Sequence, residues 1–263
     1  MMEINDETTT RQLRLLTYNI QVGIKTSTFP EYVTGGWKHL LPSRARQQNL
    51  EQIASLLAPY DIVALQEVDR GSMRTSFINQ VEYLATKANF PFSYHQLNRN
   101  LGRFAQHGNG VLSRFEPSLV VDYKLPGFVP GRGAILIQLG QGENSLAIVV
   151  MHLALSRRAQ RLQLSYIMEF MAGYKHFVLM GDLNCVAENL VWFEEKFAKL
   201  GLQSIGENMH TFPSWRPRRG IDHVIVSSEL QVKSAEVLNC VYSDHRPIAV
   251  DIVLPFELQR LSS

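Results

Sequence analysis

Short apolar runs of the kind that form β-strands recur along the chain, and several of them carry apolar residues on both faces. They cover residues 13–20, 61–66, 145–153, 177–180, 224–226 and 248–254. Strands that are apolar on both faces are typical of sheets with another layer packed on each side. The pattern therefore predicts strands that are buried between layers.

Helical periodicity alternates with these runs. After Ser43, a suitable N-cap, apolar residues between Leu50 and Leu57 recur three and four positions apart, and the pattern stops before Pro59. The same spacing predicts three further helices, over 78–88, 160–171 and 190–200. Helices interleaved with strands indicate an α/β fold in which helices cover the sheets.

Three long stretches that contain Gly or Pro fit neither period, and we expect loops there. They are residues 23–42, 93–110 and 122–133. No internal repeat of about 20–50 residues is present, and no Pro- or Ser-rich linker divides the chain. We therefore expect a polar N-terminal extension at residues 1–12 and a single domain over residues 13–256.

Composition adds little to this picture, because 45% hydrophobic and 19% charged residues are ordinary for a globular protein. The longest apolar run, 146–155, is too short for a helix that spans a bilayer, which needs about 20 residues. The first residues are acidic and polar, unlike a signal peptide, and 2 cysteines are too few for a disulfide framework. These features predict a cytoplasmic protein, and none of them points to an obligate protein partner.

The arginines are unevenly distributed, although the formal net charge is only +2, from 26 basic and 24 acidic residues. Clusters lie at 99–132, 157–161 and 216–219. Because a guanidinium group is planar and can bind two phosphate oxygens at once, such clusters fit an anionic substrate as well as they fit solvated loops. The residues beside each cluster decide between these interpretations.

Polar residues that can carry chemistry stand at or next to the ends of the predicted strands. They are Asn19, Glu67, His152, Asp182, Asn184, Asp222, Asp244 and His245. Taken singly, each also fits a turn residue or a buried, hydrogen-bonded side chain. Taken together, they predict a reactive cleft at one rim of the sheets, where the clefts of α/β folds tend to lie.

Several familiar hydrolytic sites are excluded by the sequence. Ser243, Asp244 and His245 are consecutive, so they cannot stack as a catalytic triad, and no Gly-x-Ser-x-Gly motif is present. Neither a His-Glu-x-x-His zinc motif nor a phosphate-binding P-loop occurs. The remaining oxygen-rich set suits a hard cation such as Mg²⁺ or Mn²⁺, and its two histidines suit proton transfer. Together with the arginines, this set indicates metal-assisted hydrolysis of a phosphoester.

Eight short blocks of sequence carry a resemblance to a known family. They are residues 17–20, 65–68, 107–113, 151–153, 180–184, 211–215, 221–223 and 243–247. In this order they resemble the endonuclease/exonuclease/phosphatase superfamily, the fold shared by deoxyribonuclease-I-like and exonuclease-III-like enzymes. The resemblance implies an α/β, four-layered sandwich, in which two mixed β-sheets pack together and helices lie outside them.

The resemblance also implies a metal centre that holds Mg²⁺ or Mn²⁺. Glu67 would be the principal ligand, Asn19 would support the metal or a phosphate oxygen, and Asp244 would lie beside the metal. These three residues are therefore the expected metal site.

Five further residues receive catalytic roles from the resemblance. Asp182 and Asn184 would orient and activate the attacking water. His245, held by Asp222, would contact the phosphoryl group, because a paired carboxylate fixes the tautomer of an imidazole and favours its protonated form. His152 would contact the phosphate and could protonate the leaving oxygen.

Two departures limit what the resemblance carries over. The nuclease branches have a cation two residues after the glutamate, where this chain has Asp69 followed by Arg70. A block typical of inositol-polyphosphate 5-phosphatases is replaced here by residues 219–222. His152, in turn, resembles the deoxyribonuclease-I, sphingomyelinase and phosphatase branches more than the apurinic-site endonucleases.

The arginine clusters favour nucleic acid as the substrate and partner, since two of them adjoin motif residues. The expected substrate-binding residues are Asn109, Arg132, Arg158, Trp215 and Arg218. Trp215 fits either base stacking or a core anchor equally well. One alternative is a phospholipid or phosphoinositide hydrolase that uses the same site and touches membrane lipid head groups. Its membrane contacts would be Phe29, Tyr32, Trp37, Leu40 and Leu41. The other alternative is a binding module without activity, although every assigned position is filled.

Overall fold

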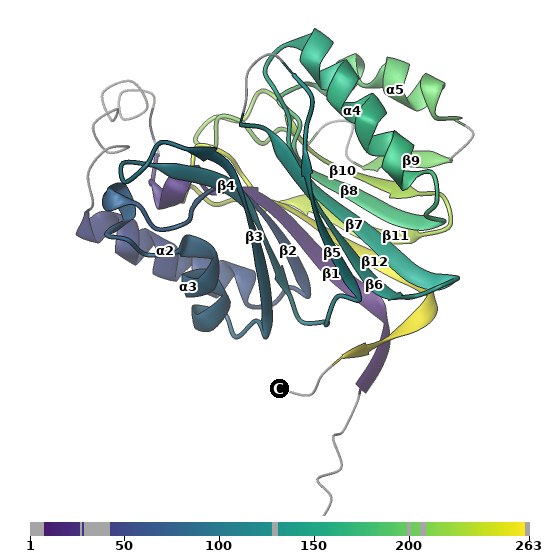
Figure 1. The fold of residues 1–263 in the computed structure, drawn as a ribbon, viewed down its shortest axis with the longest axis horizontal. Coiled ribbons are helices and arrows are strands. Elements are labelled where there is room, and N and C mark those ends of the chain that lie inside the picture. Colours follow the sequence, from purple (N-terminus) through teal and green to yellow (C-terminus); the bar gives the residue numbers. More distant parts are fainter. Residues whose placement is uncertain are drawn as a thin grey trace, which may run out of the picture.

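Two six-stranded β-sheets pack face to face in the computed structural model, and helices cover the outer face of each sheet (Figure 1). The structure describes residues 8–26, 28, 43–127, 131–198, 201–205 and 209–260. The four layers match the expected α/β sandwich of two mixed sheets flanked by helices, and this prediction is confirmed.

The first sheet has the strand order β11-β12-β1-β2-β4-β3. Its strands are β1 (Thr8–Asn19), β2 (Ile62–Asp69), β3 (Phe92–Asn100), β4 (Gln106–Ser113), β11 (Gln231–Val237) and β12 (Ile248–Arg260). β1 runs parallel to β2 and antiparallel to β12, so the first and last strands of the chain are neighbours. β1 includes residues 8–12 of the expected extension, and β12 continues past residue 256.

The second sheet has the order β5-β6-β7-β8-β10-β9. Its strands are β5 (Leu119–Lys124), β6 (Gly133–Gln141), β7 (Asn144–His152), β8 (His176–Asp182), β9 (Leu202–Ile205) and β10 (Asp222–Ser227). β7 and β8 are parallel, whereas β8 and β10 are antiparallel. Both sheets are therefore mixed.

Four α-helices form the outer layers of the described chain. They are α2 (Arg44–Leu57), α3 (Gln80–Lys87), α4 (Arg157–Met171) and α5 (Val191–Lys196). Short 3-10 helices lie at η1 (Gln21–Gly23), η3 (Met73–Thr75) and η4 (Ala187–Asn189). Ser43, Asn79 and Ser156 each cap an α-helix by accepting a hydrogen bond from a backbone N–H of its first turn. The predicted cap at Ser43 is thus confirmed.

The strands are apolar on both faces because each face packs on a different layer. Leu15 and Ile62 point into the core between the sheets, which also holds Val150. Leu16 and Tyr18, one position away from this face, pack instead beneath α2 and α3. The period of two in the sequence therefore separates two different cores.

The expected loop over residues 93–110 is wrong, because these residues form the hairpin of β3 and β4. β3 is an edge strand that is only half buried and rich in polar residues, so it lacks a clear apolar alternation. In β4, Gly108 and Gly110 break the apolar pattern where Gln96 and Val81 approach the backbone.

Other predicted elements were correct in kind but not in length. The stretch 122–133 begins inside β5, and the helix predicted over 190–200 is the shorter α5, which ends at Lys196. Most of the stretch 23–42, including the expected membrane-contacting residues, lies outside the described residues. Among the described residues, no helix is long and apolar enough to cross a membrane.

Candidate active site

Strand register brings three of the expected catalytic side chains into one row. Asp182 at the end of β8 is paired with His152 on β7 and with Asp222 on β10. Residues paired in register point to the same face of a sheet. The rim formed by β7, β8 and β10 therefore carries a carboxylate flanked by an imidazole and a second carboxylate.

Asp182 lies at the centre of this arrangement. Its Oδ2 lies 3.0 Å from Asn19 Nδ2, 3.4 Å from His152 Nε2 and 3.8 Å from His245 Nε2. Its Oδ1 accepts a hydrogen bond of 2.9 Å from the backbone N–H of Asn184. Because these partners come from β1, β7, and the segments after β8 and before β12, one carboxylate joins the two sheets at the site.

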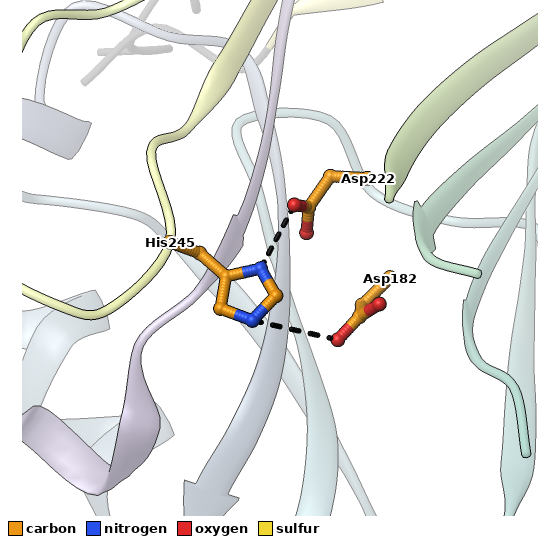
Figure 2. Close-up of side chains that lie close together, drawn as sticks. All are labelled: Asp182, Asp222 and His245. Carbon is orange, nitrogen blue, oxygen red and sulfur yellow. Dashed lines mark hydrogen bonds and ion pairs between the residues drawn. The ribbon is translucent and has the colours of Figure 1, made fainter. Parts of the chain in front are cut away.

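His245 is held between two carboxylates (Figure 2). Its Nδ1 lies 2.8 Å from Oδ2 of Asp222, which also accepts a hydrogen bond of 2.5 Å from Thr211 Oγ1. Burial by itself lowers the pKa of His245, but the charges of Asp222 and Asp182 outweigh burial and raise this pKa well above its usual value. These two carboxylates therefore favour the imidazolium form of His245.

His152 has the opposite electrostatic character. Burial lowers its pKa to about 3, and the neighbouring charge of Asp182 only partly compensates. Arg132 and His245 lower it further. His152 is thus neutral near pH 7, and the protonated imidazole of the pair is His245. The expected role of His152 as a proton donor stays a prediction, and burial favours the neutral form of its ring.

Glu67 projects from an irregularity in β2. The register between β2 and β4 shifts between Gln66 and Val68, and Glu67 has a left-handed backbone with φ of 55°. Such a β-bulge re-aims a side chain from its strand. Glu67 Oε1 accepts a hydrogen bond of 3.2 Å from Asn19 Nδ2.

Asn19 links the two carboxylates of Glu67 and Asp182. Its Nδ2 donates to both Glu67 and Asp182, while its Oδ1 accepts a hydrogen bond of 3.1 Å from the backbone N–H of Gln21. The expected support of a metal by Asn19 stays a prediction. Asn19 fixes the spacing of two acidic groups.

Asp244 is buried and lies near the charge of Glu67. Burial raises the pKa of the Asp244 carboxyl to about 6; His245 lowers it, whereas the charge of Glu67 raises it. Ser243 Oγ lies 2.7 Å from the backbone oxygen of Asn19 and 3.1 Å from Oδ1 of Asp244, either of which can accept its single O–H hydrogen. The negative charge of Glu67 therefore disfavours the charge of the buried Asp244. A divalent cation would stabilise both carboxylates.

The donor set fits a divalent metal. Asp182, Asp222 and His245 offer ligand atoms that lie within 4.8 Å of one another. The charges of Asp222 and Asp182 favour the protonated form of His245, which would compete with a cation for these two carboxylates. Glu67 and Asp244, with Asp182 beside them, offer only oxygens, which hard cations prefer. These carboxylates could therefore hold a metal.

Asn184 and Cys185 come shortly after Asp182 in the sequence. Asn184 Nδ2 donates a hydrogen bond of 3.0 Å to the backbone oxygen of Leu153, which ties the end of β8 to the end of β7. Burial raises the pKa of the Cys185 thiol to about 12, so this residue is a packed thiol and not a nucleophile.

The expected substrate-binding residues are only partly brought together. Arg132 lines a pocket with Glu67 and His152, as expected. Asn109 does not line it; it is buried, and its Nδ2 donates 2.9 Å to the backbone oxygen of Gly133. Three others lie outside this pocket: Arg158 and Arg218 are exposed, and Trp215 is half-buried.

Sequence reasoning missed three residues that the structure places at the site. His107 and Arg99 line the pocket of Arg132, and Thr211 hydrogen bonds to Asp222. His107 stands at the start of a block that carried the family resemblance, and Arg99 belongs to an arginine cluster, so both signals were present in the sequence. Nothing in the sequence pointed to Thr211 except its place in the block of residues 211–215.

The chain is similar to known proteins both in sequence profile and in fold. Residues 16–245 match the profile of the Endonuclease/Exonuclease/phosphatase family. A solved endonuclease/exonuclease/phosphatase from Beutenbergia cavernae DSM 12333 has a TM-score of 0.70 and 20% identity, covering 93% of this chain and 72% of that one. The human Nocturnin catalytic domain with bound sulfate anion has a TM-score of 0.67 and 17% identity, covering 94% and 96%.

A third similar structure is the mannosyl-6-phosphatase of Bacteroides thetaiotaomicron VPI-5482, with a TM-score of 0.66 and 17% identity, covering 92% of this chain and 100% of that one. At such identities the likeness concerns the fold. No curated protein sequence matches this chain significantly.

Proposed function

Because the chain belongs to the endonuclease/exonuclease/phosphatase family, whose members are phosphoester hydrolases, we propose that it is a divalent-metal-dependent phosphodiesterase that acts on nucleic acid. One observation carries the proposal. The Asp182 carboxylate lies within 3.8 Å of Asn19, His152 and His245, beside a pocket lined by the arginine Arg132. An acidic, proton-bearing centre next to a cationic pocket is suited to a phosphate ester and water.

The carboxylates of Glu67 and Asp244 would hold the metal, with Asp182 beside it. Their oxygen donors favour Mg²⁺ or Mn²⁺ over softer cations. When bound, such a metal stabilises charge on the phosphoryl oxygens and makes a bound water more acidic. Asn19 keeps the carboxylates of Glu67 and Asp182 at a fixed spacing through its two donated hydrogen bonds.

The remaining residues orient and move protons. Asp182 is placed to accept the proton of an attacking water, and its carboxylate is fixed by the backbone N–H of Asn184. Asp222 accepts from Nδ1 of His245 and thereby directs Nε2 of the same ring toward Asp182 and the reacting phosphate. This preorganisation lets the ring donate to a phosphoryl oxygen without rearrangement.

Nucleic acid is supported by arginines next to an aromatic surface. Arg157 and Arg161 line a second pocket with Trp192 and Cys185, and Cys185 directly follows Asn184. The Arg161 guanidinium lies 5.3 Å from the centre of the Trp192 ring. Trp192 is half-buried, and arginine beside a partly accessible aromatic ring is typical of surfaces that bind single strands by stacking and phosphate contact.

A substrate panel tests the proposal. The purified protein with Mg²⁺ or Mn²⁺ is incubated with duplex DNA, single-stranded DNA, RNA, phosphoinositides, sphingomyelin and mannose 6-phosphate, and each reaction is repeated with EDTA. We expect EDTA-sensitive cleavage of a nucleic acid. Cleavage of a lipid or sugar phosphate alone would replace the nucleic-acid substrate, and no metal-dependent hydrolysis of any member would reject the function.

Site variants link the activity to this centre. Asp182→Asn is expected to abolish hydrolysis, because Asn keeps the shape of the side chain but cannot accept a proton as a carboxylate does. Asp122→Asn, which makes the same change at an exposed position of β5, is the matched control and should retain activity. Full activity of Asp182→Asn would reject the site.

A further inference from the structure

The pocket beside Glu67 and His152 extends away from the acidic centre toward the hairpin of β3 and β4. It has a volume of about 240 Å³. Its other lining residues are Asn98, Arg99, His107, Gly108, Gly131 and Arg132. The pocket therefore continues beyond the place where the proposed reaction occurs.

The strand order fixes how far the pocket reaches. Glu67 is on β2, His107 is on the neighbouring β4, and Arg99 is paired with His107 on the edge strand β3. Since neighbouring strands lie about 4.8 Å apart, the backbone of Arg99 is roughly 10 Å from that of Glu67 across the sheet. A group held at the Arg99 end is thus separate from a phosphate held between Glu67 and Asp182.

Two arginines line this pocket: Arg132 lies near the charges of Asp182 and Glu67, and Arg99 lies at the far end. Within the described residues, neither the Arg99 nor the Arg132 guanidinium has a hydrogen-bond or ion-pair partner. Gly131, which precedes Arg132 and has φ of +100°, packs on the Arg99 side chain: a Cβ at position 131 would lie 3.1 Å from Arg99 Cβ. Burial lowers the pKa of Arg132, whereas the charges of Asp182 and Glu67 favour its charged form.

The polar groups around these cations suit phosphate. Guanidinium groups bind the oxygens of phosphate through paired N–H donors, and His107 and Asn98 add further hydrogen-bonding groups. The Asn98 side chain is held against the backbone of Gly133, where any Cβ would overlap its Oδ1. Gly131 contacts Arg99 at this end of the pocket.

We propose that Asn98, Arg99, His107 and Arg132 form a subsite for a second, uncleaved phosphate of the substrate, and that this phosphate is the terminal phosphomonoester of an oligonucleotide. The inference rests on the proposed phosphodiesterase function and specifies its substrate. A monoester presents three free oxygens to the two guanidinium groups and the imidazole, whereas an internal diester presents only two. The enzyme therefore prefers a strand end that carries a phosphate.

A binding experiment tests the subsite without hydrolysis. The affinity of the wild-type protein for a nucleoside 3′,5′-bisphosphate, a 3′-monophosphate and a 5′-monophosphate is measured by calorimetry in EDTA. We expect the bisphosphate to bind about tenfold more tightly than either monophosphate, as one additional set of charge-assisted hydrogen bonds implies. Arg99→Gln should bring this ratio close to one. Arg103→Gln, at an exposed position of the same hairpin, is the matched control and should leave the ratio unchanged.

Equal affinities in the wild type, or an unchanged ratio in Arg99→Gln, would overturn the subsite. A kinetic arm then compares kcat/KM for a dinucleoside monophosphate with kcat/KM for the same dinucleotide phosphorylated at its 5′ or its 3′ end, with Mg²⁺. One phosphorylated form should be preferred by about tenfold, and Arg99→Gln should lose that preference. If the enzyme does not prefer either phosphorylated dinucleotide, the subsite is contradicted. If nothing is hydrolysed but the bisphosphate still binds more tightly than the monophosphates, only the proposed function is contradicted.

Discussion

Nε of Arg74 lies 2.6 Å from Oδ2 of Asp69, and both side chains are buried, with 2% and 0% of their surface exposed. Asp69 stands two residues after Glu67, where the nuclease branches carry a cation. It also accepts hydrogen bonds from the backbone N–H groups of Gly71 and Ser72. Although burial raises the pKa of Asp69, the hydrogen bonds from Arg74 and Gly71 hold it below its usual value. The pair thus organises the chain that follows Glu67.

Loss of this buried pair is expected to cost much more than loss of an exposed one. Arg74→Ala leaves the Asp69 charge buried without its cation and should lower the free energy of unfolding by about 3–5 kcal/mol. Arg11→Ala removes the exposed pair with Glu257 and should cost less than about 1 kcal/mol. Urea unfolding of both variants measures the difference. Similar losses would show that the buried pair does not stabilise the segment after Glu67.

The hydrogen bond between His245 and Asp222 predicts a catalytic defect without unfolding. Asp222→Asn preserves the shape of the side chain but removes the charge that orients and protonates the imidazole. We expect kcat on the substrate that the panel identifies to fall by about 10²–10⁴, with an unchanged circular dichroism spectrum. Glu82→Gln, exposed on α3, should leave kcat unchanged. An Asp222→Asn enzyme with wild-type kcat would contradict the dyad.

Metal binding should be visible without any substrate. Because a cation binds the folded state only, Mg²⁺ or Mn²⁺ at about 100 times its Kd should raise the Tm of the wild-type protein by ~5–10 °C. Glu67→Gln should lose most of this rise, since it removes a carboxylate ligand. The exposed variant Glu82→Gln serves as its control. A full Tm increase in Glu67→Gln would remove Glu67 from the metal site.

Gly181 is expected to be essential for placing Asp182. Its φ is +149°, and a Cβ at this position would overlap the backbone oxygen of Met151, its partner on β7. Gly181→Ala should therefore disrupt the pairing of β7 and β8 and cost more than about 2 kcal/mol. Gly142→Ala also changes a glycine with positive φ, but nothing lies within 4 Å of its Cβ, so the cost should be only about 1 kcal/mol. Equal costs would show that the close approach is unimportant.

His95 on β3 predicts a loss of stability in acid. Burial lowers its pKa from 6.5 to about 4, and its Nε2 has no hydrogen-bond partner in the described chain. Between these two pH values the unfolded chain binds a proton that the folded chain does not. The free energy of unfolding therefore falls as the pH is lowered through this window. His95→Phe should make this decline shallower in urea titrations at pH 4–6.5, and parallel declines in the two proteins would contradict the prediction.

The sequence predicted elements correctly where interactions between residues close in the chain decide the structure. Ser43 caps α2 as predicted, because capping depends on residues within one turn. The runs that are apolar on both faces form strands between two layers, because each of their faces can be buried against a different layer. The β3–β4 hairpin was missed, because a half-buried edge strand and glycines selected by close packing of Val81 and Gln96 leave no clear period.

By itself, the sequence determined the family, the sandwich of two sheets and the set of polar residues that end the strands. Only the tertiary structure decided how these residues act. The register of β7, β8 and β10 places Asp182 between His152 and Asp222, and such long-range pairing leaves no local signal. The two histidines look alike in sequence, yet His245 is charged and His152 neutral. The balance between burial and neighbouring charges decides this difference, and that balance depends on distances that only the folded chain sets.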